Sequence, residues 1–421
     1  DYYASRGLGD VYKRQVIMVS KKENTKYRGC SFMLIQFTVE NHRSIKNSAV
    51  ISFAASKDKS FEEYLLHPDA KKTLLPTLAI YGANAAGKSN VLHAMMTMKE
   101  MVVGNAAKAS KGQKLPWEPF GSMKEATTFE IMFIFQGVRY TYGFSFDAKK
   151  IYKEYLFHWP NGREALIFFR ENGVYEFREN INEQMTLSNR TPDNKLYLVS
   201  SNDWNLPQTE NAYRWFLEKL TFLMDEEPAT SETVAQIASG DDKKARILKE
   251  LLLADLGITD VAIKNSQGKI PVITTTHRIM NEDGTTEYFQ LLMEQESAGT
   301  QHFFARIGGW LQALEKGALL VVDEIEDSLH PLLTRRLIEM VQDKTINTKG
   351  AQLVFTTHDA MLLDLKFFRR DQIWFAEKDD RTCATELYSL VSFSPRKGEN
   401  VRKGYLQGRF GAIPFIGGDT E

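Results

Sequence analysis

The stretch GANAAGKS, residues 82–89, constrains the fold of this 421-residue chain more than any other feature. It matches the pattern G-x-x-x-x-G-K-[ST], with an apolar strand pattern before it and a helical pattern of apolar residues after it. In such a turn, consecutive backbone N–H groups point at phosphate oxygens, and the start of the helix adds positive potential. The sequence therefore predicts a phosphate-binding loop between a buried strand and a helix.

Two side chains give this loop its chemistry. Lys88 is expected to reach the β- and γ-phosphates of a nucleotide, and Ser89 is expected to bind Mg²⁺. The alternative is a chance glycine-rich turn. The strand and the helix on the correct sides favour the phosphate-binding interpretation.

Two further segments end buried strands with polar side chains. LLVVDEIE, residues 319–326, places Asp323 to hold Mg²⁺ through water and Glu324 to act as general base on the attacking water. TTHD, residues 356–359, places His358 where it can contact a γ-phosphate. The alternatives are solvated carboxylates and a structural histidine. The carboxyl ends of parallel strands meet at one sheet edge, so we expect all three motifs to converge there.

A second anion site is indicated by ESAGTQHF, residues 296–303, which precedes a helix with one apolar face. Ser297 and Gly299 lie at the expected start of that helix, where the backbone favours negative charge. A chain with one phosphate-binding loop needs no second one for its own nucleotide. A dimer does need it if each subunit covers the γ-phosphate that the other subunit holds.

Composition limits the remaining possibilities. The net charge is −1 and the pI is about 6.8, so nucleic acid would have to bind a local patch. Two cysteines, Cys30 and Cys383, cannot form a disulfide framework, and no zinc-ligand spacing is present. No apolar run reaches the ~18 residues of a membrane span. We therefore expect a cytoplasmic protein without membrane contact.

With these motifs in view, the sequence resembles the ABC-type ATPases of the RecF, SMC and OLD kind. More narrowly it resembles the AAA family ATPases of prokaryotic anti-phage operons, the group of the RloA, AbiL-type and PARIS ATPases. The narrow resemblance rests on FTVENHRSI near the first strand, on ADLGI at 254–258, on SAGT and SLHP, and on the ending YLQGRFGAIPF. It implies an α/β P-loop NTPase with an ABC-type head, a parallel core sheet, an antiparallel β lobe and a helical insertion.

The resemblance also implies roles for individual residues. Asp323 and Glu324 would be the Walker B pair, His358 the switch histidine and residues 327–330 the D-loop. Ser297 and Gly299 would act in trans as the signature. The residues implied in binding ATP within one copy are Arg43, Asn84, Ala85, Ala86, Gly87, Lys88, Ser89 and Asn90.

Two positions depart from the family pattern or stay open. Ala298 stands in the signature where relatives often carry an acidic residue or glycine. Gln136 is a candidate Q-loop glutamine, but it falls in a predicted hairpin, and the alternative is that it is merely a turn residue.

Domain limits follow from changes of pattern along the chain. Residues 1–32, which begin with the foreign-looking DYYASRGLGDVYKRQ, are predicted to be a non-native or disordered extension. An N-terminal ATPase lobe is expected over 33–210, with antiparallel strands near 127–200. A helical insertion is expected over 211–265, and a C-terminal ATPase lobe over 266–421.

Function is then expected to be ATP hydrolysis with Mg²⁺ in a homodimer or higher homo-oligomer. The dimer would act as sensor or scaffold for a separate effector, a nuclease or toxin, in anti-phage defence. One alternative is a RecF- or SMC-like DNA-repair ATPase that acts directly on DNA. Another is a mainly ATP-bound oligomeric scaffold with slow turnover. The basic stretch PRKGENVRKGYLQGRFG at 395–411 either contacts DNA phosphates or an acidic partner, or is a solvated tail packed by Tyr405, Phe410 and Phe415.

Overall fold

The structure of the chain is a computed structural model. It describes the following residues: 32–69, 72–224, 226–254, 257–264, 271–396 and 398–414. The predicted N-terminal extension therefore lies outside the described residues, except Phe32, which already belongs to the first strand. Asp255 and Leu256 of the ADLGI stretch also lie outside them.

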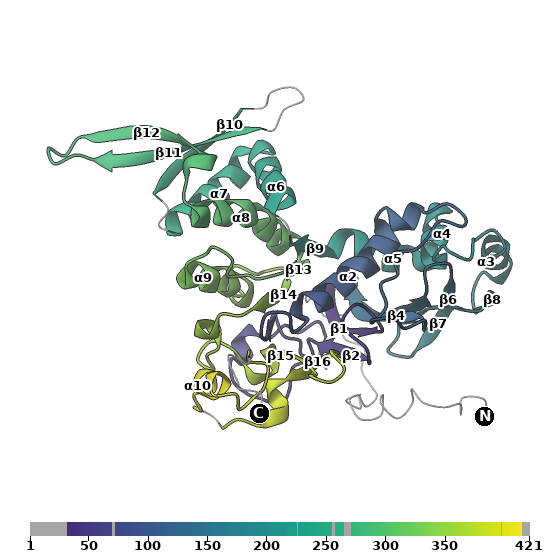
Figure 1. Cartoon of the computed structure of the whole chain (residues 1–421). Helices are drawn as coiled ribbons and strands as arrows, with labels where there is room; N and C mark the ends of the chain where they lie inside the picture. The colour runs from purple at the N-terminus through teal and green to yellow at the C-terminus, as the bar shows by residue number, and fades with distance from the viewer. Residues whose placement is uncertain are drawn as a thin grey trace.

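A six-stranded sheet forms the centre of the fold (Figure 1). All of its neighbouring strands run parallel except the last pair, β15 and β16, which is antiparallel. The predicted parallel core sheet is therefore confirmed. In spatial order the strands are β16 (Thr385–Ser389), β15 (Ile373–Lys378), β3 (Thr77–Tyr81), β14 (Gln352–Thr357), β13 (Leu319–Val322) and β9 (Leu220–Leu223).

A seven-stranded antiparallel sheet forms the second layer. It confirms the predicted antiparallel lobe and adds to it the first two strands of the chain, which come from outside residues 127–200. In spatial order its strands are β2 (Ala49–Ser52), β1 (Phe32–Glu40), β4 (Thr127–Phe135), β5 (Val138–Phe146), β6 (Ile151–Trp159), β7 (Ala165–Glu171) and β8 (Val174–Phe177).

Strand β3 shows how the central sheet separates two hydrophobic cores. Leu78 and Ile80 contribute to the core shared with the antiparallel sheet, whereas Ala79 and Tyr81 contribute to the core on the opposite face. Successive residues of a strand point to opposite faces, so an all-apolar strand is buried on both sides. The helices of the first core are α2 (Lys88–Val103), α3 (Ile181–Ser188), α4 (Tyr197–Asp203) and α5 (Pro207–Lys219).

The opposite core is covered by α8 (Ala298–Lys316) and α9 (Pro331–Gln342). Helices α6 (Glu226–Ala238) and α7 (Asp241–Leu253) pack against α8. The remaining short elements are α10 (Val401–Leu406) and the 3-10 helices η1 (Glu62–Tyr64), η2 (Ala106–Lys108), η3 (Met293–Gln295), η4 (Ala360–Leu362), η5 (Arg370–Gln372) and η6 (Leu390–Phe393). In the described part of the chain, no helix is long and apolar enough to cross a bilayer.

A third sheet projects from the body beside α6, α7 and α8 (Figure 1). Its three antiparallel strands are β10 (Ile258–Lys264), β11 (Val272–Met280) and β12 (Thr286–Leu292). The sequence analysis did not predict this sheet. The outer strand β12 is almost entirely exposed, so it lacks the alternation of buried and exposed residues that marks a strand in a sequence.

The range 211–265, expected as a helical insertion, contributes to four parts of the structure. Most of α5 packs with the first core through Trp215 and Phe216. Strand β9 pairs with β13 at the edge of the central sheet. Only α6 and α7 form the expected helical unit, and β10 belongs to the projecting sheet.

Gln352 joins the two large sheets. Its side chain accepts a hydrogen bond from Leu34 N–H (2.6 Å) and donates to the carbonyl oxygens of Leu34 (3.1 Å) and Leu75 (3.2 Å). The register between β1 and β4 shifts between Leu34 and Gln36, where a bulge interrupts the ladder. The Gln352 amide therefore binds backbone groups at an irregular point of β1.

We predict that Gln352→Leu lowers the free energy of unfolding by about 1–3 kcal/mol, because the backbone groups of Leu34 and Leu75 lose a buried partner. Chemical denaturation measures this difference. The control is Gln290→Leu on the exposed strand β12, which should change stability by less than about 0.5 kcal/mol. Equal effects of the two substitutions would contradict a bridging role for Gln352.

His42, in the loop after β1, should make the stability of the fold depend on pH. The side chain is fully buried, and its ring nitrogens have no hydrogen-bond partner among the described residues. Burial, followed by the neighbouring charge of Arg43, lowers its pKa from 6.5 to about 4. Between these two values the unfolded chain binds a proton that the folded chain does not bind.

The contribution of His42 to the free energy of unfolding should therefore fall as the pH drops from 6.5 to about 4, by up to about 3 kcal/mol, and level off below that. His42→Phe should flatten this dependence, since the ring packs against Phe129 and carries no proton. Urea denaturation across the pH range measures it. The exposed His330, replaced by asparagine to keep a helix cap, is the control and should leave the slope unchanged.

Candidate functional site

The phosphate-binding loop connects β3 to α2 as predicted. Ala85 and Gly87 adopt left-handed conformations, with φ of 63° and 93°. Glycine is required at Gly82 and Gly87, because a Cβ atom at Gly82 would overlap the Ala376 carbonyl and one at Gly87 would overlap the Thr385 hydroxyl. Asn84 and Ala85 are exposed at the outside of the turn, whereas Ala86 is buried.

Lys88 folds back over this loop. Its ammonium donates hydrogen bonds to the carbonyl oxygens of Gly82 (2.9 Å) and Ala83 (3.1 Å), and the residue is 5% exposed. Burial lowers the Lys88 pKa, and the acidic residues of the 323–326 segment oppose this shift. The loop therefore holds a buried positive charge that a phosphate can compensate.

Ser44 and Thr385, neither predicted as a site residue, fix the loop from outside. The Asn90 amide donates to Ser44 Oγ (2.7 Å), and the Thr385 hydroxyl donates to the Ala86 carbonyl (2.9 Å) and lies 2.7 Å from Ser44 Oγ. Asn90, expected to contact nucleotide, uses its side chain here on the loop. Ser44 follows the singled-out Arg43 in the sequence, but no local pattern pointed to Thr385.

Arg43 lies beside this group with a φ of 50° and is about a third exposed. Its backbone N–H donates to the Glu118 carbonyl (2.8 Å), and its Nε donates to the Glu118 carboxylate (2.6 Å). This hydrogen bond lowers the Glu118 pKa. The predicted nucleotide-contacting arginine is thus held by an acid that the sequence analysis missed.

Asp323 meets Ser89 across the sheet edge. The Ser89 hydroxyl donates to Asp323 Oδ1 at 3.0 Å, although 234 positions separate the two residues. Hydroxyl and carboxylate oxygens are the ligands that Mg²⁺ prefers, so this pair fits the predicted metal role. No cluster of three or more His, Cys, Asp or Glu suited to a metal occurs among the described residues. A P-loop magnesium site instead completes its shell with phosphate and water oxygens.

Glu324 follows Asp323 in a left-handed conformation, with a φ of 44°, and its side chain is exposed. Its backbone N–H donates to the Thr356 hydroxyl at 2.8 Å. The carboxylate of Glu324 therefore stands at the open edge of the site, where a general base must lie to reach water.

His358 directly follows β14, at the same sheet edge, and its side chain is exposed. Its backbone N–H donates to Glu326 Oε1 (2.6 Å), and its Nδ1 lies 3.0 Å from the same oxygen. Glu326, the third acid after β13, was missed by the sequence analysis. It orients the histidine ring and leaves Nε2 on the side away from this contact.

Ser297 and Gly299 begin helix α8, as predicted. Ser297 Oγ accepts a hydrogen bond from Thr300 N–H (3.2 Å), which is a helix cap. A Cβ at Gly299 would lie 2.9 Å from the Ser328 carbonyl, so the start of α8 touches the 327–330 segment of its own chain. The preceding Glu296 binds His277 of the projecting sheet (2.6 Å). All of these contacts are made at the start of α8. Ser297 stays exposed.

Gln136 lies far from these residues. With Gly137 it forms the two-residue turn between β4 and β5, and both have positive φ. This turn lies at the Phe32 end of β1, whereas the Arg43 loop follows Glu40 at the other end. The two ends are roughly 26 Å apart at the usual rise of a strand. The structure therefore supports the turn interpretation over the Q-loop interpretation.

The basic C-terminal stretch is packed onto the body by its aromatic residues. Tyr405 and Phe410 are buried and stack against Phe375 of β15. Arg409 forms an ion pair with Glu399. The packing interpretation is confirmed for Tyr405 and Phe410, and Phe415 lies outside the described residues.

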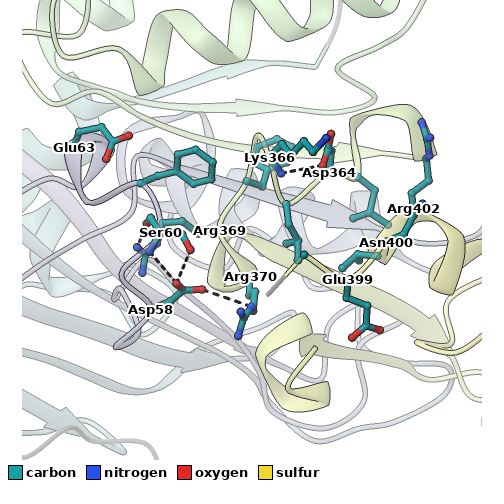
Figure 2. A pocket seen from close by; sticks show the side chains of 16 residues that line it. Asp58, Ser60, Glu63, Asp364, Lys366, Arg369, Arg370, Glu399, Asn400 and Arg402 are labelled. Atoms are coloured by element: carbon teal, nitrogen blue, oxygen red, sulfur yellow. Dashed lines mark hydrogen bonds and ion pairs between the residues drawn. The ribbon is translucent and has the colours of Figure 1, made fainter. Parts of the chain in front are cut away.

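A separate cavity of about 710 Å³ lies between the segments 58–63, 363–370 and 398–402 (Figure 2). Its charged side chains have both signs. Arg370 lies 3.7 Å from Asp58, and Lys366 stands beside Asp364, while Arg402 and Glu399 point in opposite directions (Figure 2). None of the predicted site residues lines this cavity.

Comparisons with known proteins give distant structural likenesses. The SMC head domain from Thermotoga maritima has 11% identity and a TM-score of 0.39, with 85% of this chain and 98% of that chain covered. A structure of the recombination mediator protein RecF with ATP, from the RecFOR pathway, has 12% identity and a TM-score of 0.35, with 87% and 100% covered. No curated protein matches the sequence.

A comparison with protein families gives the more specific result. The family described as "AAA domain, putative AbiEii toxin, Type IV TA system" matches residues 78–364. This match begins in β3, just before the phosphate-binding loop, and ends after His358, so it includes Lys88, Asp323 and Glu324. Because it extends over more than half of the chain, the chain belongs to this AAA-domain family.

Proposed function

We propose that this protein is an ABC-type ATPase that binds ATP with Mg²⁺ and hydrolyses it. The observation that carries the proposal is the contact between the Ser89 hydroxyl and the Asp323 carboxylate, which brings the phosphate-binding loop to the end of β13. Lys88 directly precedes Ser89 in the sequence, and Glu324 directly follows Asp323. A loop for phosphates, a metal-binding pair and an exposed carboxylate are the parts that phosphoryl transfer to water requires.

Each residue has a distinct role in this reaction. The buried Lys88 ammonium leaves the carbonyls of Gly82 and Ala83 and compensates the charge of the β- and γ-phosphates. Glu324 accepts a proton from the attacking water. Ser89 and Asp323 would hold Mg²⁺, which would supply positive charge beside the phosphate oxygens. His358, whose ring contacts Glu326, would contact the γ-phosphate through Nε2.

We further propose that two copies sandwich the nucleotide, with Ser297 and Gly299 of one copy over the phosphates of the other. Exposure of Ser297 at the start of a 19-residue helix supports this, because that helix end attracts anions. The contact of Gly299 with Ser328 also supports the sandwich, because it brings the 327–330 segment to the same proposed dimer interface.

The biological setting is inferred from the family. Its description names a toxin and a toxin–antitoxin system, which supports a role in conflict between a cell and an invading element. We propose that the nucleotide-bound dimer senses infection and controls a separate effector, a nuclease or toxin. ATPase rates measured with and without DNA separate this role from a repair ATPase that acts on DNA directly.

Glu324→Gln should lower the ATP turnover number by at least about a hundredfold while ATP binding is retained, because the amide cannot accept the proton. Phosphate release and the binding of a fluorescent ATP analogue measure the two effects. The control is Glu339→Gln, an exposed carboxylate on α9, which should keep wild-type turnover. Normal turnover of the Glu324 variant would remove the general-base role.

The sandwich is tested by mixing two inactive variants. Lys88→Ala removes the phosphate contact, and Ser297→Arg blocks the exposed helix start. A mixed dimer has one damaged site and one intact site, so an equal mixture should recover roughly a quarter of wild-type turnover. Each variant alone should stay inactive and keep its melting temperature within a few degrees. A mixture that stays inactive, although co-purification of two differently tagged variants shows mixed dimers, would contradict the sandwich.

A further inference from the structure

The side chain of Thr356 lies between the two acidic residues that follow β13. Thr356 is the penultimate residue of β14 and is fully buried. Its hydroxyl donates to Asp323 Oδ1 and accepts the backbone N–H of Glu324 at 2.8 Å. Its carbonyl oxygen accepts the N–H of Ile325 at 3.1 Å. One residue of the neighbouring strand therefore holds three consecutive residues of the Asp323–Ile325 turn.

The contact with Asp323 fixes the orientation of a carboxylate. Oδ1 accepts hydrogen bonds from two hydroxyls, that of Thr356 and that of Ser89 (3.0 Å). Hydrogen bonds to ionised acceptors are the stronger class, and they restrict the rotation of the carboxylate. The outer partners of a metal ligand set its position and its affinity for the metal.

The contact with Glu324 holds a strained backbone. A φ of 44° is unfavourable for a residue with a side chain, and the surrounding structure must stabilise it. The hydrogen bonds from the N–H groups of Glu324 and Ile325 to Thr356 supply this stabilisation. The left-handed turn in turn decides where the exposed Glu324 carboxylate points.

We propose that Thr356 is a positioning residue that sets both the metal-binding orientation of Asp323 and the backbone turn of the general base Glu324. This inference rests on the proposed ATPase function. It assigns a role to a residue of β14 that precedes His358 by two positions, so the end of one strand both holds the acidic turn and leads into the proposed switch histidine.

The test compares Thr356→Val, which keeps the shape and removes the hydroxyl, with Thr356→Ser, which keeps the hydroxyl. The valine variant should lower kcat by about ten- to hundredfold, with little change in the KM for ATP, as expected when a charge-assisted hydrogen bond is lost. It should also raise, by about tenfold, the Mg²⁺ concentration needed for half-maximal binding of a fluorescent ATP analogue. The serine variant should stay within about threefold of wild type in both measurements.

Thr334→Val is the matched control. Thr334 in α9 is also fully buried, and its hydroxyl has no hydrogen-bond partner among the described residues. Its replacement should leave kcat and the Mg²⁺ dependence unchanged. Melting temperatures of all three variants show whether each is folded, and an unfolded valine variant is replaced by Thr356→Ala for the same comparison with serine.

Three outcomes would overturn the positioning role. The first is a valine variant with wild-type kcat and Mg²⁺ dependence. The second is a serine variant as impaired as the valine variant, which would assign the effect to packing. The third is a lower kcat with unchanged Mg²⁺ dependence, which would show that Thr356 does not orient Asp323 for metal binding. If the wild-type protein binds ATP but does not hydrolyse it, the proposed function fails, while the Mg²⁺ dependence of binding still tests Thr356.

Discussion

The parallel pairing of β3, β14 and β13 is the constraint on which the candidate site depends. Parallel strands start and end on the same sides of a sheet, so the loops after these three strands emerge at one edge. This pairing brings Ser89 within hydrogen-bond distance of Asp323. A shift of one residue in the β13–β14 register would move the Thr356 hydroxyl to the other face and away from both acids.

Burial on both faces makes that register well defined. Alternate residues of the central strands enter two different hydrophobic cores, so a slipped strand would lose apolar contacts on both sides at once. Gln352 adds a polar contact at the start of β14, because its amide binds backbone groups of Leu34 in β1 and of Leu75, just before β3. The phosphate-binding loop is therefore attached to a rigid centre, and the exposed β10–β12 sheet lies outside it (Figure 1).

Charge is distributed unevenly across the site. Lys88 is buried against loop carbonyls and faces the acidic segment after β13, whereas Glu324 and His358 stand at the open side. The acids around Lys88 stabilise its charge in a place where burial opposes it. A bound triphosphate would take over that stabilisation, because its negative charge is opposite in sign to the Lys88 ammonium.

The sequence by itself determined the elements that depend on local pattern. The glycine spacing of residues 82–89 and the apolar strands ending at Asp323 and His358 predicted the loop, the parallel core and the acidic edge, because backbone conformation and strand burial leave a local record. Only the tertiary structure showed what Thr356, Ser44, Thr385 and Glu118 contact at the site. Their hydroxyls and carboxylate act through partners up to 341 positions away, and a threonine that binds a carboxylate looks in sequence like any other strand residue. Likewise, whether β9 completes the central sheet was decided by which strand edge was free to pair, which is a property of the assembled sheet.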